Sequence, residues 1–560
     1  MKLKNIIVFI TSILTLCTGC VGGYLDVNDN PNRPTQAELN KLLTGAQYEM
    51  GNALAPGNYI GASLPSYVFH QSSREVDNFG LNPSYSTLGN TWLQSYTYGL
   101  KNANTVIREG ENTENWIYAG IGKLLKAYMF AQIVDLWGDV PYHDFDVEGN
   151  YAPKLDSSKD IYNELFTLID DGIDDLKKTE GNLLKPSSDD LFYNGNTTKW
   201  IKMGNTLKLK LLVQSRKAKS DIAGWNEKLS AVLSANSFLG NGEDLEFKHT
   251  AKDNPDERNQ AYVSEYLGGQ STYPISPWIY ETMVGRNLNV KNNPFVNITD
   301  PRIPYYWVCQ IKADGVAQNQ TDYRDGAFVS IFFASNSSYV GNDQRSTSTF
   351  LGIYPCGGKY DDGNGGKCDS KVGTGIAPDK MLQAYSVPFL LAELYLTGEA
   401  TGDAKAALKE GISRSIVHVN TVSQAAKADG VTVPEIKVAD ASVTAFIDKV
   451  LAVYDAAASN DEKLRIVMTQ KWIANFFNPV EAYSDIRRTG YPTLLPQATG
   501  YAQSPYKNSK EPEEGITDIP LKGINAFPRG MWYPTSEVTR NPNVTNEGRV
   551  LASPLVFWDK

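Results

Sequence analysis

Hydrophobic positions recur at helical spacing in four pairs of segments, and this pattern predicts a mainly α-helical protein. In one segment Trp200, Met203 and Leu207 follow one another at i, i+3 and i+7, which places them on one face of a helix. Another segment has Ser386 at its start and Gly398 just past its end, the residue types typical of an N-cap and a C-cap. The predicted pairs span 88–109 and 113–136, 158–178 and 197–217, 387–397 and 402–414, and 441–457 and 459–477.

The predicted pairs are helical hairpins, similar in size to tetratricopeptide-type units. Such a hairpin buries its apolar face only against a neighbour, so we expect the pairs to form a scaffold. The tetratricopeptide consensus is not legible, however, and the pairs do not recur at a fixed spacing. Periodicity therefore predicts four tetratricopeptide-like hairpins with a few short strands between them, and it does not assign a repeat family.

Two long regions break the helical pattern. They are rich in Gly, Asn, Ser and Pro, with only short strand-like runs such as 328–333. Irregular segments of this length are uncommon inside a compact protein unless they are functional, and binding residues concentrate on loops that a rigid scaffold carries. We therefore expect a single domain over 36–560. It comprises a helical scaffold over about 36–235 and 381–485, a loop-rich ligand-face insertion over about 236–380, and an irregular C-terminal segment over 486–560.

The first twenty residues have the order of a bacterial lipoprotein signal. Lys2 and Lys4 precede an apolar run at 6–16 that is too short to span a membrane, and small residues lead directly into Cys20. This order resembles the lipobox, in which the cysteine thiol takes the diacylglycerol. Cys17 departs from the pattern, because Leu is usual three positions before the lipidated cysteine. An ordinary secretory signal followed by a chance cysteine is the alternative.

The signal predicts how the mature chain is held. Residues 1–19 are expected to be a lipoprotein signal peptide, and Cys20 is expected to be the lipidation site that carries palmitate and further acyl chains. Residues 20–35 are polar and turn-rich, which is typical of a tether. No later apolar run approaches the ~20 residues of a membrane helix, so we expect lipid alone to anchor the protein.

Composition narrows the classes of partner. The formal charge is −10 and there is no basic tract, which argues against nucleic acid because its phosphates are held largely by Lys and Arg. The chain also has 31 Tyr and 10 Trp. Much of this aromatic surface is expected in the core, and some of it is available to stack on a ligand.

Catalytic signatures are largely missing. The sequence has no zinc-protease motif, nucleophile elbow, Walker loop or dinucleotide fingerprint, and none of its four histidines has a ligand-spaced partner. We therefore expect no catalytic residue, no cofactor and no metal site. Two alternatives stay open. Carboxylates for glycoside hydrolysis need proximity only in space, and the Asp-rich loop 361–369 is a candidate cation loop, although turn chemistry explains it and it does not match an EF-hand.

Three cysteines remain downstream of Cys20, at positions 309, 356 and 368. An odd number cannot all pair internally. Cys356 and Cys368 lie close together in a Gly-rich loop and the exported compartment is oxidising, so they are the candidates for a disulfide. The spacing leaves open whether these two thiols pair or stay free.

Five motifs, together with the lipobox and the opening run Tyr-Leu-Asp-Val-Asn at 24–28, occur in a recognisable order. They are Asp-Leu-Trp-Gly-Asp-Val-Pro-Tyr at 135–142, Asp-Pro-Arg at 300–302, Gln-Lys-Trp-Ile-Ala-Asn-Phe at 470–476, Glu-Ala-Tyr-Ser-Asp-Ile-Arg-Arg-Thr-Gly-Tyr-Pro at 481–492 and Trp-Tyr-Pro-Thr-Ser-Glu at 532–537. In this order they resemble the SusD/RagB family of outer-membrane nutrient-binding lipoproteins, in its SusD-like subgroup. The resemblance covers the whole chain and is weakest over the insertion. Physically, the large Trp and charged Arg side chains of these motifs are expected to be scaffold, not ligand contacts.

The resemblance implies a fold and a role. Family members have a helical fold on four tetratricopeptide-like hairpins, with loop insertions that form the ligand face. They sit at the cell surface, anchored in the outer membrane by lipid, as a lid over a SusC-like TonB-dependent transporter. The lid captures an oligosaccharide, or in some members a peptide, and delivers it without chemistry. Two other classes remain as alternatives: a surface-anchored glycan hydrolase, and a helical-repeat scaffold or adhesin.

Candidate ligand residues follow from the chemistry of sugars. A sugar ring has apolar C–H faces rimmed by hydroxyls, so its site needs flat aromatic rings and polar partners. Trp278 and Trp307 in the insertion are the leading candidates. The further candidate aromatics are Tyr280, Tyr273, Phe79, Tyr67, Phe69 and Tyr85, with Asp77 and Asn78 as polar partners. For each loop aromatic, packing in the core is the alternative.

Overall fold

The computed structural model describes residues 38–72, 82, 84, 86–268, 273–288, 290, 292–333, 344–493 and 527–560. Helices dominate this part of the chain, and its strands form three two-stranded antiparallel sheets. The predicted mainly α fold with a few short strands is therefore confirmed. Among these residues no helix is both long and apolar enough to cross a bilayer.

The helices predicted from periodicity form close to their predicted bounds, except that the helix predicted over 402–414 continues to Ala426. The first pair becomes α4 (Ser86–Leu93), the π-helix η2 (Gln94–Leu100), α5 (Lys101–Asn112) and α6 (Trp116–Trp137). The others are α7 (Ser158–Lys177) with α8 (Thr197–Gln214), α14 (Ser386–Thr397) with α15 (Ala404–Ala426), and α16 (Ala441–Ala456) with α17 (Asn460–Ala474). The helix α17 packs more on α14 and α15 than on α16, its expected partner. The tetratricopeptide-like stacking therefore stays a prediction.

Several shorter elements were not predicted. In the scaffold they are α2 (Leu39–Ala53), α3 (Tyr59–Tyr67), the 3₁₀ helix η3 (Arg216–Asp221), α9 (Trp225–Ala235) and α18 (Pro479–Thr489), with α19 (Thr535–Arg540) near the C-terminus. In the insertion they are α10 (Gln260–Tyr262), the π-helix η4 (Val263–Leu267), α11 (Pro277–Val284), α12 (Ile303–Tyr306) and α13 (Ile353–Cys356). The insertion is thus less irregular than expected, because short helices recur through it.

The strands show how the insertion is attached. They are β1 (Leu245–Phe247), β2 (Trp307–Val308), β3 (Tyr323–Asp325), β4 (Phe328–Ser330), β5 (Phe350–Leu351) and β6 (Asp379–Leu382). The first strand pairs antiparallel with the last, so that Leu245 lies opposite Leu382. The two ends of the insertion are thereby joined, and the chain between them leaves and re-enters the scaffold at one place.

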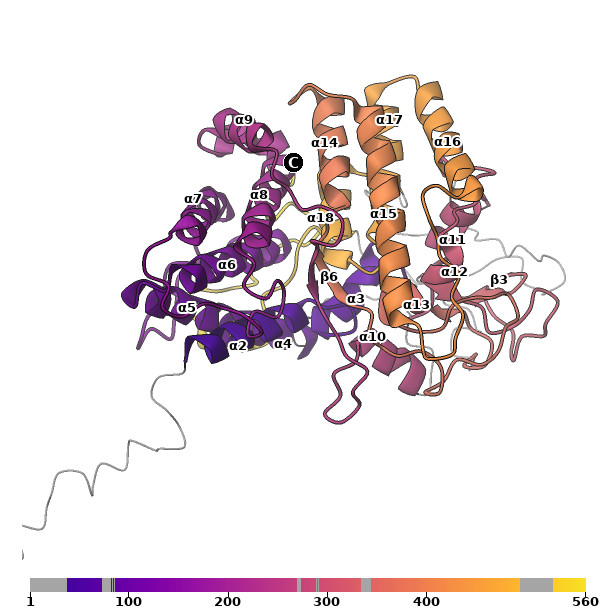
Figure 1. Cartoon of the computed structure of the whole chain (residues 1–560), viewed down its shortest axis with the longest axis horizontal. Coiled ribbons are helices and arrows are strands. Elements are labelled where there is room, and N and C mark those ends of the chain that lie inside the picture. The colour runs from indigo at the N-terminus through magenta and orange to yellow at the C-terminus, as the bar shows by residue number, and fades with distance from the viewer. Residues whose placement is uncertain are drawn as a thin grey trace, which may run out of the picture.

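Figure 1 shows two groups of helices side by side. Helices α2 and α4 to α9, in indigo and magenta, lie on one side, and α14 to α17, in orange, lie on the other. The strand β6 and the helix α18 run between the groups, α10 and α13 lie at the lower ends of the orange helices, and α11 and α12 lie beside α15. The insertion therefore extends from the junction of the groups along the C-terminal group.

One predicted helix boundary needs correction. The helix α14 begins at Ser386 itself, with Tyr385 before it in a right-handed helical conformation, so Ser386 is the first helical residue and not the N-cap. The other end agrees with the prediction. Gly398 follows α14 with a φ of 82°, a left-handed conformation that glycine adopts at little steric cost.

The junction of the two groups is filled by charged side chains from the sequence motifs. Arg488 on α18 pairs with Glu393 on α14 and, at 2.6 Å, with Asp485. Asp485 also pairs with Lys471 on α17 at 2.9 Å, and Lys210 on α8 pairs with another α18 carboxylate. All of these side chains are buried. The charged motif residues therefore act as scaffold, because they connect α8, α14, α17 and α18.

The other motifs are part of the same interior. The guanidinium of Arg302 donates to both oxygens of Asp300, to the Ser415 hydroxyl and to the Gln470 side-chain oxygen. The indole of Trp472 donates to the backbone oxygen of Val68 at 2.7 Å. These contacts join the insertion and α3 to α15 and α17.

Candidate functional site

The structure brings four of the predicted ligand aromatics into one cluster beside α11. The rings of Phe69 and Trp278 lie 5.5 Å apart between centroids, and those of Tyr280 and Trp307 lie 6.1 Å apart. Tyr280 also stacks on Phe328 with centroids 3.8 Å apart. Phe69, from the described start of one candidate segment, thus meets the candidate segment 273–307 in space.

Backbone contacts confirm that these segments adjoin. The amide of Ser72 donates to the oxygen of Pro274 at 2.8 Å, and Gln71 forms an isolated bridge with Ile275. The hydroxyl of Ser330 in β4 donates to the oxygen of Ile275 at 2.6 Å. The segment that follows α3, the segment that precedes α11 and the strand β4 therefore lie next to one another.

The described members of the candidate set are buried, which corrects the expectation that they offer open ring faces. Their exposed fractions are 2% for Trp278, 1% for Trp307, 8% for Tyr280, 3% for Tyr273, 0% for Tyr67 and 2% for Phe69. A sugar stacks only on an uncovered face, and other aromatic rings cover these. These aromatics are candidates because they lie in loop-rich segments of the sequence. Such a position does not indicate whether a side chain is buried. Four further candidates, Phe79, Tyr85, Asp77 and Asn78, lie outside the described residues.

The candidate disulfide does not form in this structure. Cys356 and Cys368 are both free and buried. Cys309 is also free and is partly buried. The Cys356 thiol donates to the backbone oxygen of Gly352, 3.4 Å away. Burial is the main reason that the pKa of Cys368 is raised to about 12, so this thiol stays protonated.

The loop 361–369 is held by turn chemistry. One oxygen of Asp361 accepts from the Cys309 amide at 2.9 Å, and the other accepts from the Gly363 amide. Asp362 accepts from the amide of Asn364. The bonds to Gly363 and Asn364 are those of Asx turns, and the bond from Cys309 ties the loop to the chain after β2. Across the described ranges, no group of three His, Cys, Asp or Glu side chains has the arrangement of a metal site.

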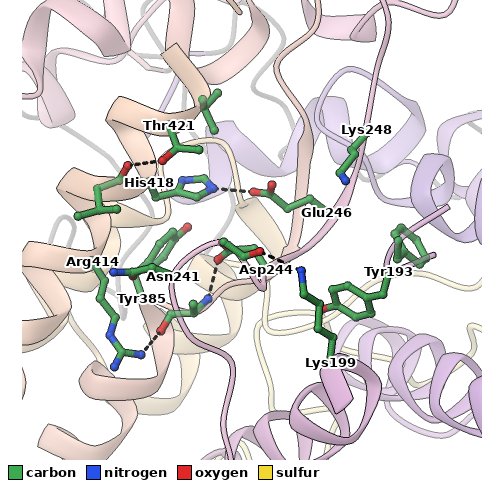
Figure 2. A pocket seen from close by; sticks show the side chains of 15 residues that line it. Tyr193, Lys199, Asn241, Asp244, Glu246, Lys248, Tyr385, Arg414, His418 and Thr421 are labelled. Carbon is green, nitrogen blue, oxygen red and sulfur yellow. Dashed lines mark hydrogen bonds and ion pairs between the residues drawn. The ribbon is translucent and has the colours of Figure 1, made fainter. Parts of the chain in front are cut away.

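A polar pocket that the sequence reasoning missed lies between the two groups of helices (Figure 2). Its volume is about 210 Å³. Strand β1 and its flanks supply Asp244, Glu246 and Lys248, and α15 supplies Arg414 and His418. The alternation of polar and apolar residues over 244–248 was the available signal, since it is typical of a strand with one polar face.

Two charged groups in this pocket have shifted pKa values. Burial is the largest cause that raises the pKa of Asp244 to about 6, while His418 acts in the opposite direction. Burial acts to lower the pKa of His418, but the Glu246 carboxylate outweighs it and the net shift is upward. His418 and Glu246 lie 2.6 Å apart (Figure 2), and the other ring nitrogen of His418 is 2.8 Å from the Tyr354 hydroxyl.

This pocket has one feature of a glycosidase site. Such sites pair a carboxylic acid of raised pKa with a second carboxylate. Asp244 fits the first description, but Glu246 is engaged by His418 and its side chain is only 14% exposed. The pocket is therefore better suited to fixing β1 against α15 than to attack on a bound sugar.

Comparison with known proteins identifies similar chains. A SusD-like family model, described as starch-binding and associating with the outer membrane, matches residues 31–510. No curated protein matches the chain.

Solved structures share the fold over almost the whole chain. A chitin-binding protein is 21% identical, with a TM-score of 0.63 and coverage of 93% of this chain and 100% of that one. A SusD/RagB family protein from Bacteroides thetaiotaomicron is 20% identical, with a TM-score of 0.63 and coverage of 94% and 99%. A chitin-binding SusD homolog from Flavobacterium johnsoniae is 18% identical, with a TM-score of 0.61 and coverage of 92% and 98%.

Proposed function

The chain belongs to the SusD-like family, described as starch-binding and associating with the outer membrane, and from this premise we propose that it captures oligosaccharide at the cell surface. The match over residues 31–510 is the observation that carries the proposal. Within this role the protein binds its ligand and leaves it chemically unchanged. A peptide is the alternative ligand.

Cys20 anchors the protein in the outer membrane in this proposal, and residues 20–35 form its tether. The sequence order around Cys20 supports it. Changing Cys20 to Ala should abolish labelling by radioactive palmitate and release the protein from the outer-membrane fraction. The matched control is Cys17→Ala, because Cys17 lies within the signal and is removed with it. Palmitate labelling that survives in Cys20→Ala would contradict the assignment.

Delivery to a SusC-like TonB-dependent transporter completes the role. The family's association with the outer membrane supports a partner there. We expect the tagged, lipidated protein to co-purify from detergent-solubilised membranes with one barrel-sized partner. Isolation of the protein alone under conditions that preserve other outer-membrane complexes would argue against a stable lid.

Ligand capture is tested by calorimetric titration of the protein that begins after Cys20. The probes are maltohexaose, chitohexaose and a peptide mixture; the first two follow the description of the family and the names of two structural neighbours. We expect saturable binding of one glycan class. Phe79→Ala should weaken it, because Phe79 remains a proposed ligand contact, whereas Tyr151→Ala, at a residue that is 89% exposed, should not. Binding of the peptides alone would replace glycan by peptide as the ligand.

Hydrolysis is the alternative that the polar pocket raises, because Asp244 has the raised pKa of an acid catalyst. The measurement is release of reducing ends during prolonged incubation with each hexasaccharide. We expect none above the buffer blank. Sustained release that Asp244→Asn abolishes would establish the protein as a hydrolase and overturn the proposal of binding without chemistry.

A further inference from the structure

A second groove, with a volume of about 360 Å³, lies where α2 meets β1 and the hairpin that follows it. The hairpin, residues 248–258, is closed by backbone bonds between Thr250 and Glu257 and between Glu257 and Lys252. It projects from the body of the molecule near α10 (Figure 1). The groove shares Lys248 with the polar pocket but is otherwise separate from it.

The wall of the groove on α2 is a stripe of one helix face. Thr44, Tyr48 and Asn52 follow at i, i+4 and i+8, so their side chains lie in a row. The opposite face of α2, including Leu43 and Met50, is buried in the core. The stripe is therefore directed away from the core of the protein.

Tyr48 is the unusual residue of this stripe. Its side chain is 53% exposed, although it lies in a groove and not on a projecting loop. The ring of Phe247 in β1 meets it at 73°, with centroids 5.7 Å apart, and thereby supports it from one side. The Asn52 amide donates to the backbone oxygen of Tyr48 at 2.8 Å. A supported aromatic ring with an uncovered face is the feature that the buried aromatics around α11 lack.

Polar groups rim the ring. Arg258 lines the groove, and its guanidinium is fixed by two bonds to Asp256, at 2.9 and 2.8 Å, which use two of its five N–H donors. The Glu257 carboxylate accepts from Lys252 at 2.8 Å. Lys248 is exposed, and Figure 2 draws no interaction from its ammonium group to the other residues of the polar pocket. The same groove is therefore lined by an exposed aromatic ring and by polar donors and acceptors.

We propose that this groove is a second carbohydrate subsite, in which a pyranose ring stacks on Tyr48 and its hydroxyls bond to Asn52, Lys248 and the Arg258–Glu257 rim. Apolar C–H groups of the sugar pack on the ring face, and the polar rim replaces the water that the hydroxyls lose. The inference rests on the proposed function for the class of ligand. The inference goes beyond the proposed function because it gives the protein a second point of attachment, which raises the avidity for a long glycan chain.

The test places a probe at Tyr48 itself. Protein labelled with 3-fluorotyrosine is titrated with maltohexaose, chitohexaose and xylohexaose at millimolar concentration, and the Tyr48 fluorine resonance is identified from its disappearance in Tyr48→Phe. We expect one hexasaccharide to shift the Tyr48 resonance saturably. Tyr98, which is 43% exposed on η2 outside the groove, is the internal control and should not shift.

Calorimetry on the same samples separates this inference from the proposed function. Tyr48→Ala should weaken one of two binding events by about tenfold, the scale of a lost aromatic contact, and leave the melting temperature unchanged. Heat of binding without any shift at Tyr48 would overturn the second subsite and leave glycan capture standing. No heat with any of the three sugars would overturn the subsite together with glycan as the ligand.

Discussion

The junction between the two groups of helices and the aromatic cluster beside α11 are both buried, but opposite chemistry fills them. At the junction Arg488 lies between Glu393 and Asp485, and each charge depends on its neighbours. In the cluster Trp307 packs among aromatic rings such as Tyr280, and its own side chain carries no charge. Each region takes residues from segments far apart in the sequence.

The two regions should respond differently to the substitution of a buried side chain. A buried charge that loses its partner carries a desolvation cost that nothing offsets, whereas a smaller apolar side chain leaves a cavity whose cost depends on how far the surroundings relax. The junction therefore fixes the geometry of four helices, and the aromatic cluster contributes mainly buried apolar area. Four predictions test or sharpen this contrast.

Truncation in the aromatic cluster should have the largest effect. Trp307→Ala is expected to lower the free energy of unfolding by about 3–5 kcal/mol, because it removes a fully buried indole and leaves a cavity. Chemical denaturation measures the change, with the exposed Tyr151→Ala as the control. A loss of unfolding free energy as small as that of the exposed control would show that the Trp307 ring is not part of the packed core.

Breaking the ion network at the junction should lower the free energy of unfolding by nearly as much. Arg488→Met is expected to destabilise the protein by about 3 kcal/mol, because it leaves Glu393 and Asp485 buried with one fewer partner. The comparison is Lys405→Met, which removes an exposed pair with Asp455 and should change stability by less than ~0.5 kcal/mol. If the two variants lost the same amount of stability, burial of the ion network would contribute nothing to the free energy of unfolding.

The polar pocket should make stability depend on pH. The pKa of Asp244 is about 6 in the folded protein and lower in the unfolded chain, so between these values the folded state binds more protons. Stability therefore falls as the pH rises from about 4 to 6, as the Asp244 carboxyl ionises in its buried site.

Asp244→Asn removes this ionisation and should raise the unfolding free energy at neutral pH by about 1–2 kcal/mol. Melting temperatures of both proteins between pH 4 and 8 measure the difference. A variant whose pH profile runs parallel to that of the unchanged protein would contradict the prediction.

The smallest expected effect concerns the three cysteines downstream of Cys20, all of which lie in the insertion. Protein that begins after Cys20 and is purified without reductant should show three reactive thiols once unfolded, because Cys309, Cys356 and Cys368 are free. Before unfolding, their burial should make them slow to react. A single reactive thiol after unfolding would reveal a disulfide between the other two.

Most of the helical scaffold followed from the sequence, for a physical reason visible in α7 and α8. Each helix has an apolar stripe of helical period and a side-chain N-cap, at Ser157 and Asn196, so local sequence and packing agree. Two of the missed helices, α3 and α11, are short, and their apolar residues are covered on several sides. Their pattern shows no clear stripe because several tertiary neighbours, and not one face, bury them.

The candidate site was much less predictable. Trp278 and Trp307 carry the chemistry of a sugar platform but are buried, whereas Tyr48, in a helix that was not predicted, is exposed in a groove. Residue type states what a side chain can bind, but exposure depends on which distant segments pack over it. Tyr48 became a candidate only because the structure shows the 248–258 hairpin beside α2.

The sequence by itself determined the mainly helical scaffold, the order of the motifs and the family to which they belong, because helical periodicity and short motifs are local properties of the chain. Tertiary structure alone decided which aromatic rings are open, which thiols are free and which carboxylates are buried together. These are properties of contacts between residues hundreds of positions apart, as between Lys210 and Glu481. Such contacts form only when the whole chain folds, so no local pattern records them.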